Sequence, residues 1–544
     1  MAEALTATAG GDRSASGAAP AIPPAPPRPV AHPPLSGPAL VLGTLALSAS
    51  TFMNVLDSSI ANVSIPAIAG NLGVSPNQGT WVITSFGVAN AISVPLTGWL
   101  TRRFGAVKLF TASVWLFVLT SWLCGFAHSL EWLVAFRVLQ GLVAGPMIPL
   151  SQTLLLASYP PAKAGMALAM WGMTTLVAPV VGPLLGGWIT DNFSWPWIFY
   201  INVPVGLAAG ALTWLIYHRR ETPTVKLPID GIGLVLLVLG VGALQLMLDK
   251  GKELDWFSSN EIITLAVVAA VALVFLVIWE LGDDHPVVEL RLFARRNFLV
   301  GSVTLAVAYA LFFGNVVLLP LWLQQHMGYN ATQAGMAMAP VGVLAILLTP
   351  LSGRKVATWD PRWMATVAFL VFALVLWLRS GFTPQADFGH ILVPTVIQGA
   401  ALAFFFIPLN VIVLAGLTPD RIPAAAGLSN FLRITAGAMG TSISTTLWDD
   451  RAILHRAHLS ELLHNGNAVF QDMLGRLTSA GLSREQALAQ INRLIDQQAY
   501  TRAADDIFLV SSWIFLGLIA LVWLTQRPKR QGGPGAAADA GGAH

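Results

Sequence analysis

The chain has 544 residues, of which 55% are hydrophobic and only 10% are charged, and its formal net charge is +3. Soluble domains carry about 25% charged residues, so this composition excludes an ordinary soluble protein and indicates one that crosses a membrane many times. The small net charge gives no indication of nucleic-acid binding. The single cysteine, Cys124, excludes an intrachain disulfide, and no Cys/His cluster predicts a metal site.

The two ends of the chain differ from the apolar middle. Residues 1–37 are rich in Ala and Pro and lack the continuous apolar core of a signal peptide, and residues 527–544 are rich in Gly and Ala. We expect both ends to be disordered tails. Between them, fourteen segments are apolar over about 20 residues, the length that a helix needs to cross a bilayer. These segments lie near 39–68, 79–100, 107–127, 131–157, 164–190, 197–217, 230–249, 261–281, 298–326, 331–356, 363–380, 388–416, 422–448 and 505–526.

The sequence therefore predicts an all-α polytopic membrane protein with 14 transmembrane helices. If the N-terminus is cytoplasmic, the short outer loops hold only three basic residues, Lys250, Lys252 and Arg379, and most other Lys and Arg residues fall on the cytoplasmic side. Cytoplasmic loops carry the excess of basic residues in membrane proteins. We expect both termini to lie in the cytoplasm.

Two short motifs recur at a nearly constant spacing. Residues 95–98 (Pro-Leu-Thr-Gly) return as Pro-Leu-Ser-Gly at 350–353, and residues 138–141 (Val-Leu-Gln-Gly) return as Val-Ile-Gln-Gly at 396–399. The matches pair span 2 with span 10 and span 4 with span 12, so each half holds six helices. Repeated six-helix halves with a site between them are a transporter architecture. The expected units are a first half at 38–217, two inserted helices with their loops at 218–297, and a second half at 298–526.

Asp57 is the only acidic residue of the apolar first span. A charge in the hydrocarbon core costs at least about 2.5–3.5 kcal/mol, so a chain that keeps one faces it into a cavity or a partner. Burial disfavours the charged form of a carboxylate, so the group can exchange a proton near neutral pH. We expect Asp57 to be a proton-coupling site. The alternative is an acid held in a structural salt bridge.

Two basic residues, Arg137 and Arg433, also fall inside predicted spans. Arg137 and Gln140 are three residues apart and share a helix face. We expect Arg137 to face the cavity and to respond to the charge of Asp57. For each arginine, the alternative is hydrogen bonding to carbonyls near a helix end.

The ionisable residues of the spans lie mainly in the first half, whereas the second half offers amides and aromatic rings. We expect the first half to handle protons and both halves to share a mostly apolar ligand surface, which suits large amphipathic molecules. For the aromatic and Met members of this set, the favoured alternative is ordinary packing. The residues expected to bind the substrate are Asn54, Asn62, Phe86, Asn90, Gln140, Met147, Trp171, Tyr309, Asn315, Asn410, Asn430 and Arg433.

Span 5 contains a glycine-rich segment at 182–187, Gly-Pro-Leu-Leu-Gly-Gly. Gly182 and Gly186 form a small-xxx-small face that permits close helix packing, and Pro183 removes a backbone donor and bends the helix. We expect this face to pack against a helix of the other half. Together with Gly187, these residues would form a motif for conformational change.

These segments resemble the major facilitator superfamily, in its fourteen-span drug:proton antiporter branch. Residues 56–66 look like the first-helix motif of that branch, and residues 137–141 look like its fourth-helix motif. Residues 182–187 look like the fifth-helix antiporter motif, and residues 195–204 look like the signature between spans 5 and 6. The resemblance covers about residues 38–526.

The resemblance implies proton-driven export of lipophilic and amphipathic drugs and uncouplers across the bacterial inner membrane. It implies no cofactor, because the proton gradient drives transport. Its implied partners are a periplasmic membrane-fusion adaptor and an outer-membrane channel. One departure is Arg102, which stands where the family has an acid in the loop between spans 2 and 3. The conformational lock that this acid helps to form must be made differently here or be weaker.

Two alternatives remain open. The first is a proton-coupled importer or symporter of a small organic solute with the same fold, against which the fifth-helix motif argues. The second is a polytopic membrane enzyme. We do not expect an enzyme, because the sequence shows no catalytic His/Asp/Glu cluster and no phosphate-binding Gly-rich loop.

The predicted outer loop at 450–504 is the one long soluble segment. Apolar residues recur with helical spacing at 468–477 and 484–497, and Gly481 and Ser483 separate the two runs. The pattern predicts a helical hairpin outside the membrane. We expect the hairpin to dock the adaptor. The alternatives are a lid over the transporter's own mouth and an apolar stripe that packs within the hairpin.

Overall fold

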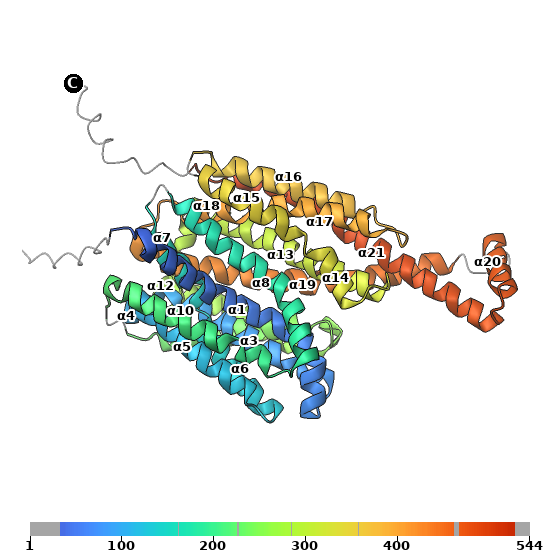
Figure 1. The fold of residues 1–544 in the computed structure, drawn as a ribbon, viewed down its shortest axis with the longest axis horizontal. Helices are drawn as coiled ribbons and strands as arrows, with labels where there is room; N and C mark the ends of the chain where they lie inside the picture. Colours follow the sequence, from blue (N-terminus) through green and yellow to red (C-terminus); the bar gives the residue numbers. More distant parts are fainter. Residues whose placement is uncertain are drawn as a thin grey trace, which may run out of the picture.

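The computed structural model describes residues 33–160, 163–225, 228–283, 286–356, 358–461 and 467–527. Within these residues the regular elements are all helices, as the composition predicts. The helices form one elongated bundle, and a pair of long helices projects from one end of it (Figure 1). Most of the two predicted tails lies outside the described residues.

The helices of residues 37–217 fall where the first six spans are predicted. Two of these spans are interrupted. A 3-10 turn at Val94–Leu96 separates the two parts of span 2, and Pro146, which has no backbone N–H to donate, precedes the second part of span 4. The helices are α1 (Gly37–Leu72), α2 (Pro76–Gly79), α3 (Trp81–Ser93), α4 (Thr97–Phe104), α5 (Ala106–Gly125), α6 (Leu130–Ala144), α7 (Met147–Ser158), α8 (Ala164–Asn192), α9 (Trp197–Tyr200) and α10 (Asn202–Tyr217).

The remaining helices comprise a peripheral pair and the second group. The peripheral helices α11 (Gly231–Lys250) and α12 (Asn260–Gly282) pack mainly on each other. The second group consists of α13 (Arg296–Gln325), α14 (Ala331–Met338), α15 (Val341–Lys355), α16 (Pro361–Arg379), α17 (Phe388–Ala403), α18 (Phe406–Val413), α19 (Ile422–Ser460), α20 (Ala468–Ser479) and α21 (Arg484–Trp523).

Twelve helices in the described part of the chain are long and apolar enough to cross a membrane. The predicted spans 164–190 and 422–448 coincide with α8 and α19, which are not among the twelve. Helix α19 is rich in Ala, Gly, Ser and Thr and packs closely against α13 and α21, so its small side chains lower its hydropathy. The count of fourteen therefore stays a prediction.

The two groups of helices are packed in the same way. Helix α1 packs along α8 in the first group, and α13 packs along α19 in the second. The groups meet tightly at the end of the bundle that carries Arg102 and Arg354. A Cβ atom on Gly165 of α8 would lie 2.5 Å from the Gly353 carbonyl oxygen of α15, and one on Gly98 would lie 2.6 Å from the Ala424 Cβ. The bundle is therefore closed at this end.

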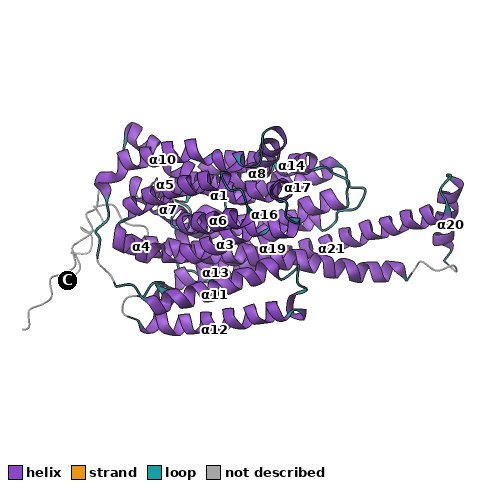
Figure 2. Cartoon of the chain, turned by 90° about the horizontal axis from the view of Figure 1, so that it is seen from below, coloured by secondary structure: helices purple, strands orange, loops and turns teal. Residues whose placement is uncertain are grey.

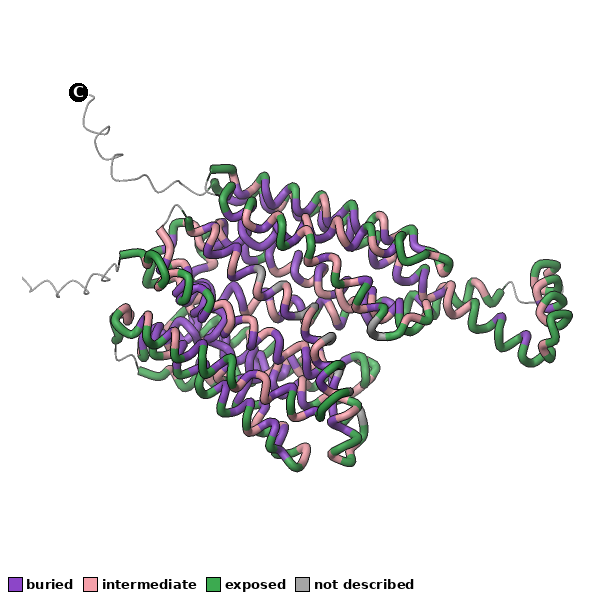
Figure 3. Tube along the Cα trace, viewed as in Figure 1, coloured by how far each residue is buried: buried purple, intermediate pink, exposed green. Residues whose placement is uncertain are grey.

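The predicted outer loop is not separate from the spans beside it. Helix α19 continues to Ser460, and α21 runs without a break from Arg484 into the last span, so both helices extend beyond the predicted spans 422–448 and 505–526. The two helices project from the bundle with α20 at the tip (Figure 2), and the projecting part is mostly exposed or half-buried (Figure 3). We call this part, residues 449–504, the stalk. Ion pairs between the two helices, such as Arg456–Asp496 at 3.2 Å, let them continue without a membrane around them.

Part of the predicted apolar stripe of the stalk is buried within the stalk itself. Leu474 of α20 packs against Ala487 and Ile491 of α21. Val469, by contrast, is 76% exposed, and Leu488 is exposed as well. The stalk therefore has a small core of its own and an apolar surface that remains uncovered.

Arg102 has an ionic partner in the linker that leads into the second group of helices. Its Nη1 lies 3.1 Å from Oε1 of Glu289. Arg102, which stands where the family has an acid, thus forms an ion pair between the end of α4 and the segment before α13.

Arg379 is wrongly assigned to an outer loop by the sequence analysis. It is the last residue of α16 and is 1% exposed. Its Nη2 donates to Gln398 Oε1 at 2.8 Å and to Thr395 Oγ1 at 3.2 Å. A cation near a helix C-terminus is favoured by the helix dipole, which a count of loop charges does not consider.

Candidate functional site

Asp57 and Arg137 form an ion pair inside the first group of helices. Both side chains are 0% exposed, and Nη1 of Arg137 lies 2.5 Å from Oδ2 of Asp57. Arg137 also donates from Nε to the Val82 carbonyl at 2.9 Å, and its guanidinium lies 4.2 Å from the centre of the Phe86 ring. A buried ion pair is favourable only when further hydrogen bonds satisfy its remaining atoms. Nε and Nη1 of Arg137 have such bonds, whereas Nη2 is buried without a hydrogen-bond partner.

The second oxygen of Asp57 has two amide donors. Asn202 Nδ2 donates to Oδ1 at 2.8 Å, and Gln140 Nε2 donates to the same oxygen at 3.2 Å. Both amides also donate to the Ser121 hydroxyl, at 3.2 Å and 2.6 Å respectively. We call Asp57, Arg137, Gln140, Ser121 and Asn202 the carboxylate cluster. Its members come from α1, α6, α5 and α10, all in the first group.

Helix α1 presents its polar side chains on one face. Thr51, Asn54, Asp57 and Ser64 are spaced by three, three and seven residues, which puts their side chains on one side of a helix, and all four are buried. Asn54 Nδ2 donates to the Ala144 carbonyl at 3.0 Å, where α6 gives way to α7. The face is therefore turned toward α6 and α7, which is why Asp57 reaches Arg137.

The glycine face of α8 packs against α1 of the same half, so the expectation that it meets the other half is wrong. A Cβ atom on Gly182 would clash with the Ser59 hydroxyl, and one on Gly186 would lie 2.7 Å from the Ile60 carbonyl oxygen. The Ser59 hydroxyl also donates to the Ala178 carbonyl at 3.3 Å. The sequence shows that this face is small but not which helix it meets. The Pro183 side chain lies outside the described residues.

A second polar cluster lies where the two groups of helices meet. Gln152 of α7 donates to Asn410 Oδ1 of α18 at 3.0 Å and accepts from Asn430 Nδ2 of α19 at 3.2 Å. Arg433 Nη2 donates to Asn430 Oδ1 at 2.8 Å. We call Gln152, Asn410, Asn430 and Arg433 the interface cluster. Gln152 and Asn410 are 258 residues apart, the same offset as the sequence repeat, so equivalent positions of the two halves meet here.

Arg433 lies among aromatic rings of both halves. Its guanidinium carbon is 4.7 Å from the centre of the Tyr309 ring, 5.6 Å from Phe406 and 5.8 Å from Trp171. The side chain is 3% exposed, and its Nε and Nη1 atoms have no hydrogen-bond partner. In the described part of the chain no carboxylate lies within ion-pair distance of Arg433. The arrangement offers a buried cation and an apolar wall to an anionic aromatic or aliphatic group.

The structure thus brings five of the predicted substrate residues together: Trp171, Tyr309, Asn410, Asn430 and Arg433. The other predicted residues lie elsewhere. Gln140 and Phe86 belong to the surroundings of the ion pair, and Asn54 bonds to the backbone beside it.

Four further predicted substrate residues lie away from the interface cluster. Met147 is packed in the core of the first group, and Asn315 donates to Ser511 at 3.2 Å within the second. Asn90 is buried in α3, and Asn62 is exposed on α1. Polarity and depth in a span do not tell which side of a helix faces the interface.

Sequence analysis missed Ser121, Asn202 and Gln152. Asn202 lies inside the signature segment 195–204, and a single amide at the start of an apolar helix was a signal. The repeat offset applied to Asn410 leads directly to Gln152. Ser121 carries no such signal, because serines are common in apolar spans.

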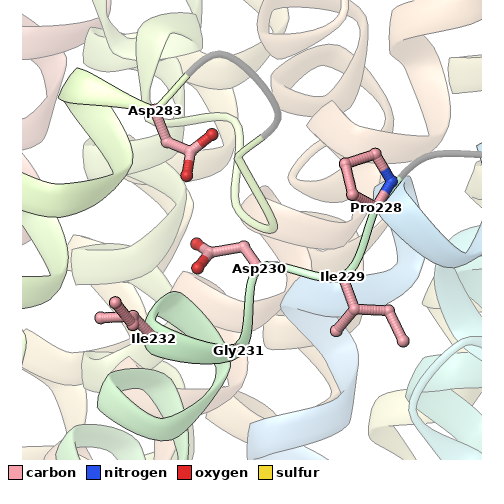
Figure 4. Close-up of a pocket in the computed structure, with 6 residues that line it drawn as sticks. All are labelled: Pro228, Ile229, Asp230, Gly231, Ile232 and Asp283. Atoms are coloured by element: carbon pink, nitrogen blue, oxygen red, sulfur yellow. The ribbon is translucent and has the colours of Figure 1, made fainter.

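A cavity of about 370 Å³ lies at the start of α11, in another part of the molecule from either cluster. Figure 4 shows its walls, which include Asp230 and Asp283. The oxygens of Asp230 are occupied, one by the Gly233 amide at 2.9 Å and one by Trp279 Nε1 at 2.9 Å. The first bond caps the start of α11, and the second joins α11 to α12. We therefore assign the cavity no part in the candidate site.

Comparison with known proteins agrees with the fold. A family model described as the Major Facilitator Superfamily matches residues 47–441. The chain is 53% identical over 512 residues to the Multidrug export protein EmrB of Escherichia coli (strain K12), covering 94% of this chain and 99% of that protein. It is 49% identical over 504 residues to the Fatty acid resistance protein FarB of Neisseria gonorrhoeae, covering 93% and 99%. The crystal structure of the human organic anion transporter MFSD10 shares the fold, with a TM-score of 0.53 at 13% identity over 88% of this chain and 100% of that one.

Replacing Gly186 by leucine tests the packing of α8 on α1. The new side chain would meet the Ile60 carbonyl oxygen, and overpacking of this kind costs about 1–3 kcal/mol of unfolding free energy. We expect Gly186→Leu to remain folded in detergent but to lose transport in reconstituted vesicles. The control is Gly70→Leu, because Gly70 of α1 faces open space. Normal transport by Gly186→Leu would show that the close approach is not needed.

Proposed function

Because the chain belongs to the major facilitator superfamily, and resembles EmrB drug exporters over nearly its whole length, we propose that it exports lipophilic and amphipathic drugs in exchange for protons. It is a transporter and not an enzyme, which excludes the membrane-enzyme alternative. The observation that supports proton coupling is the buried Asp57–Arg137 ion pair. No cofactor is required, because the proton gradient supplies the free energy.

Protonation of Asp57 would switch the ion pair. While Asp57 is charged, Arg137 is held by Asp57, Gln140 and the Val82 carbonyl. A proton on Asp57 removes the negative charge and leaves the guanidinium buried without a counter-ion, which is costly. The two charge states therefore favour different positions of α1 and α6, which is the two-state element that coupled transport needs.

Helix α8 would carry this change to the drug. Ser59 and Ile60, on the turn after Asp57, rest on the glycine face of α8, and the same helix contributes Trp171 to the surroundings of Arg433. Helix α8 also packs against α15 of the other half. A displacement of α1 is thereby passed through α8 to the boundary between the halves.

The interface cluster is the proposed drug site. It is lined from both halves, and its one cation lacks a carboxylate partner in the described chain, so the favoured ligands are lipophilic molecules with an anionic group, such as weakly acidic uncouplers. The relative FarB is named for fatty acid resistance, and fatty acids have this chemistry. Neutral and cationic drugs would use the aromatic wall without the ionic contact.

In the proposed orientation, both termini lie in the cytoplasm and the protein resides in the bacterial inner membrane. Under this orientation, the end closed by the Gly98–Ala424 and Gly165–Gly353 contacts faces the cytoplasm. The stalk then projects into the periplasm, where it would dock a membrane-fusion adaptor that hands drugs to an outer-membrane channel. Two observations favour a docking role for the stalk rather than a role as a lid. Val469 and Leu488 are exposed, and the stalk points away from the bundle.

An importer or symporter is the second candidate. The segment at 182–187 argues against it, because it resembles the fifth-helix antiporter motif. Transport direction in sealed vesicles decides between the two.

The first prediction concerns Asp57→Asn. The amide keeps the shape of the side chain but cannot exchange a proton, so drug-dependent proton flux in proteoliposomes should be abolished while drug binding and folding are retained. Flux is measured with a pH dye trapped in the vesicles. If Asp57→Asn still couples drug efflux to proton entry, the proton is carried elsewhere.

The second prediction concerns Arg433→Gln. Loss of a charged hydrogen bond costs about 2 kcal/mol, so Kd for anionic drugs should rise by about thirtyfold. Kd for neutral drugs of similar size should change little, and binding is measured by calorimetry. The matched control is Arg379→Gln, which removes a buried arginine that bonds Gln398 away from the interface. Equal losses for anionic and neutral drugs would contradict an ionic role.

The third prediction concerns the stalk. Replacing residues 461–487 by a short Gly-Ser linker removes α20 and keeps the Arg456–Asp496 and His455–Asp506 pairs. Transport by the isolated protein in proteoliposomes should persist, whereas co-purification of the adaptor and whole-cell drug resistance should be lost. Loss of transport in proteoliposomes would instead identify the stalk as a lid or gate. Adaptor binding that survives the change would place docking on the bundle.

A further inference from the structure

Asn202 is the one donor to the Asp57 carboxylate that comes from α10. We propose that Asn202 is a positioning residue that sets the pH at which Asp57 exchanges its proton. The inference rests on the proposed function, because it takes Asp57 to be the coupled proton carrier. It goes further because it assigns control of the pH of proton exchange to Asn202, a residue outside the Asp57–Arg137 pair.

The position of Asn202 limits what its side chain can do. Asn202 is the first residue of α10 and is 2% exposed. Its amide nitrogen donates to Asp57 Oδ1 at 2.8 Å and to Ser121 Oγ at 3.2 Å, so both N–H bonds are used. An amide nitrogen cannot accept a proton. The contact therefore stabilises the charged carboxylate and is lost or weakened in the neutral form.

Ser121 keeps the two amides in this orientation. Its hydroxyl oxygen accepts from Gln140 Nε2 and Asn202 Nδ2, and both nitrogens then also face Asp57 Oδ1. Arg137 donates to the other carboxylate oxygen of Asp57, Oδ2. The arginine and the amides thus act on different oxygens. If Arg137 moves away with α6 during transport, Asn202 of α10 remains at Oδ1 and determines how readily Asp57 releases its proton.

Few other groups can take over this role. The charged and titratable groups that face Asp57 are Arg137 of α6 and the thiol of Cys124 of α5, which donates to Gln140 Oε1 at 3.5 Å. Among the other helices that pack on α1, three have no titratable residue in their sequences, namely α2, α3 and α7. The titratable residues of α8, α9 and α10 are Asp191 near the end of α8, Tyr200 against Gly125, and Tyr217 bonded to Ser158. The neutral hydrogen-bond donors at Asp57 therefore adjust the pH at which it exchanges its proton.

The test measures drug-triggered proton release by the full-length protein across a pH series. Asn202→Ala removes one donor to the charged form, so the midpoint of the release should move to higher pH by about one unit. Asn202→Asp has the same shape and adds a like charge beside Asp57, so its midpoint should move further in the same direction. A purely structural role would lower the amplitude and leave the midpoint in place.

Two further variants make the result decisive. Gln245→Ala is the matched control, because Gln245 is a buried amide that donates to a different carboxylate, Asp249, at 3.3 Å. Its midpoint should equal that of the unmodified protein. Ser121→Ala frees both amides without touching Asp57 and should give a smaller shift to higher pH, which tests the inference even if the Asn202 variants fail to fold.

The outcomes separate this inference from the proposed function. An unchanged midpoint in the folded members of Asn202→Ala, Asn202→Asp and Ser121→Ala overturns the role of Asn202. If Asp57→Asn has abolished release in the same assay, Asp57 remains the carrier and only the tuning fails. Proton release that persists in Asp57→Asn instead removes the proposed function, whatever the Asn202 variants do.

Discussion

The Asp57–Arg137 ion pair exists at a depth where neither charge is stable alone. Moving an ion out of water costs several kcal/mol even in a relaxed protein, and mutual attraction offsets this only with good geometry and further hydrogen bonds. Here one carboxylate oxygen takes the guanidinium and the other takes two amides, while the guanidinium reaches the Val82 carbonyl and the Phe86 ring. A single proton on Asp57 destabilises this arrangement, because it removes the negative charge of Asp57 and leaves the positive charge of Arg137 buried. Removing one partner of a buried pair typically costs about 3–5 kcal/mol, which is enough to reverse a conformational preference.

The two polar clusters are separate, and this constrains the mechanism. The carboxylate cluster is built only from the first group of helices, whereas the interface cluster joins both groups. If the interface cluster binds the drug and Asp57 binds the proton, as proposed, the two do not compete directly for the same side chains. Their coupling has to pass through helix positions, and α8 is the physical route, since it rests on α1 through Gly182 and Gly186 and carries Trp171 to Arg433.

Much of this arrangement was predictable from the sequence, for reasons that particular residues make clear. An isolated acid in an apolar span and an arginine in another have few ways to be stable, so the pairing of Asp57 with Arg137 followed from cost alone. The repeat predicted two related six-helix halves, and the structure packs them alike, with α1 on α8 and α13 on α19. What the sequence could not show was direction around a helix. It predicted that Gly182 and Gly186 pack on a helix of the other half, whereas they pack on α1, because a small side chain does not indicate which helix it meets. It also did not show that the helices of spans 13 and 14 continue unbroken into the hairpin, where ion pairs such as Arg456–Asp496 join them.

The central claim is that the proton of the transport cycle resides on Asp57 and leaves it when drug binds. Infrared difference spectroscopy of the reconstituted protein, recorded on adding and removing drug, observes protonated carboxyl groups directly. The account predicts that drug binding removes a protonated-carboxyl band and that this change is absent from Asp57→Asn, although the variant still binds drug. The same band change in Asp57→Asn would contradict the account, because another carboxyl group would then carry the proton.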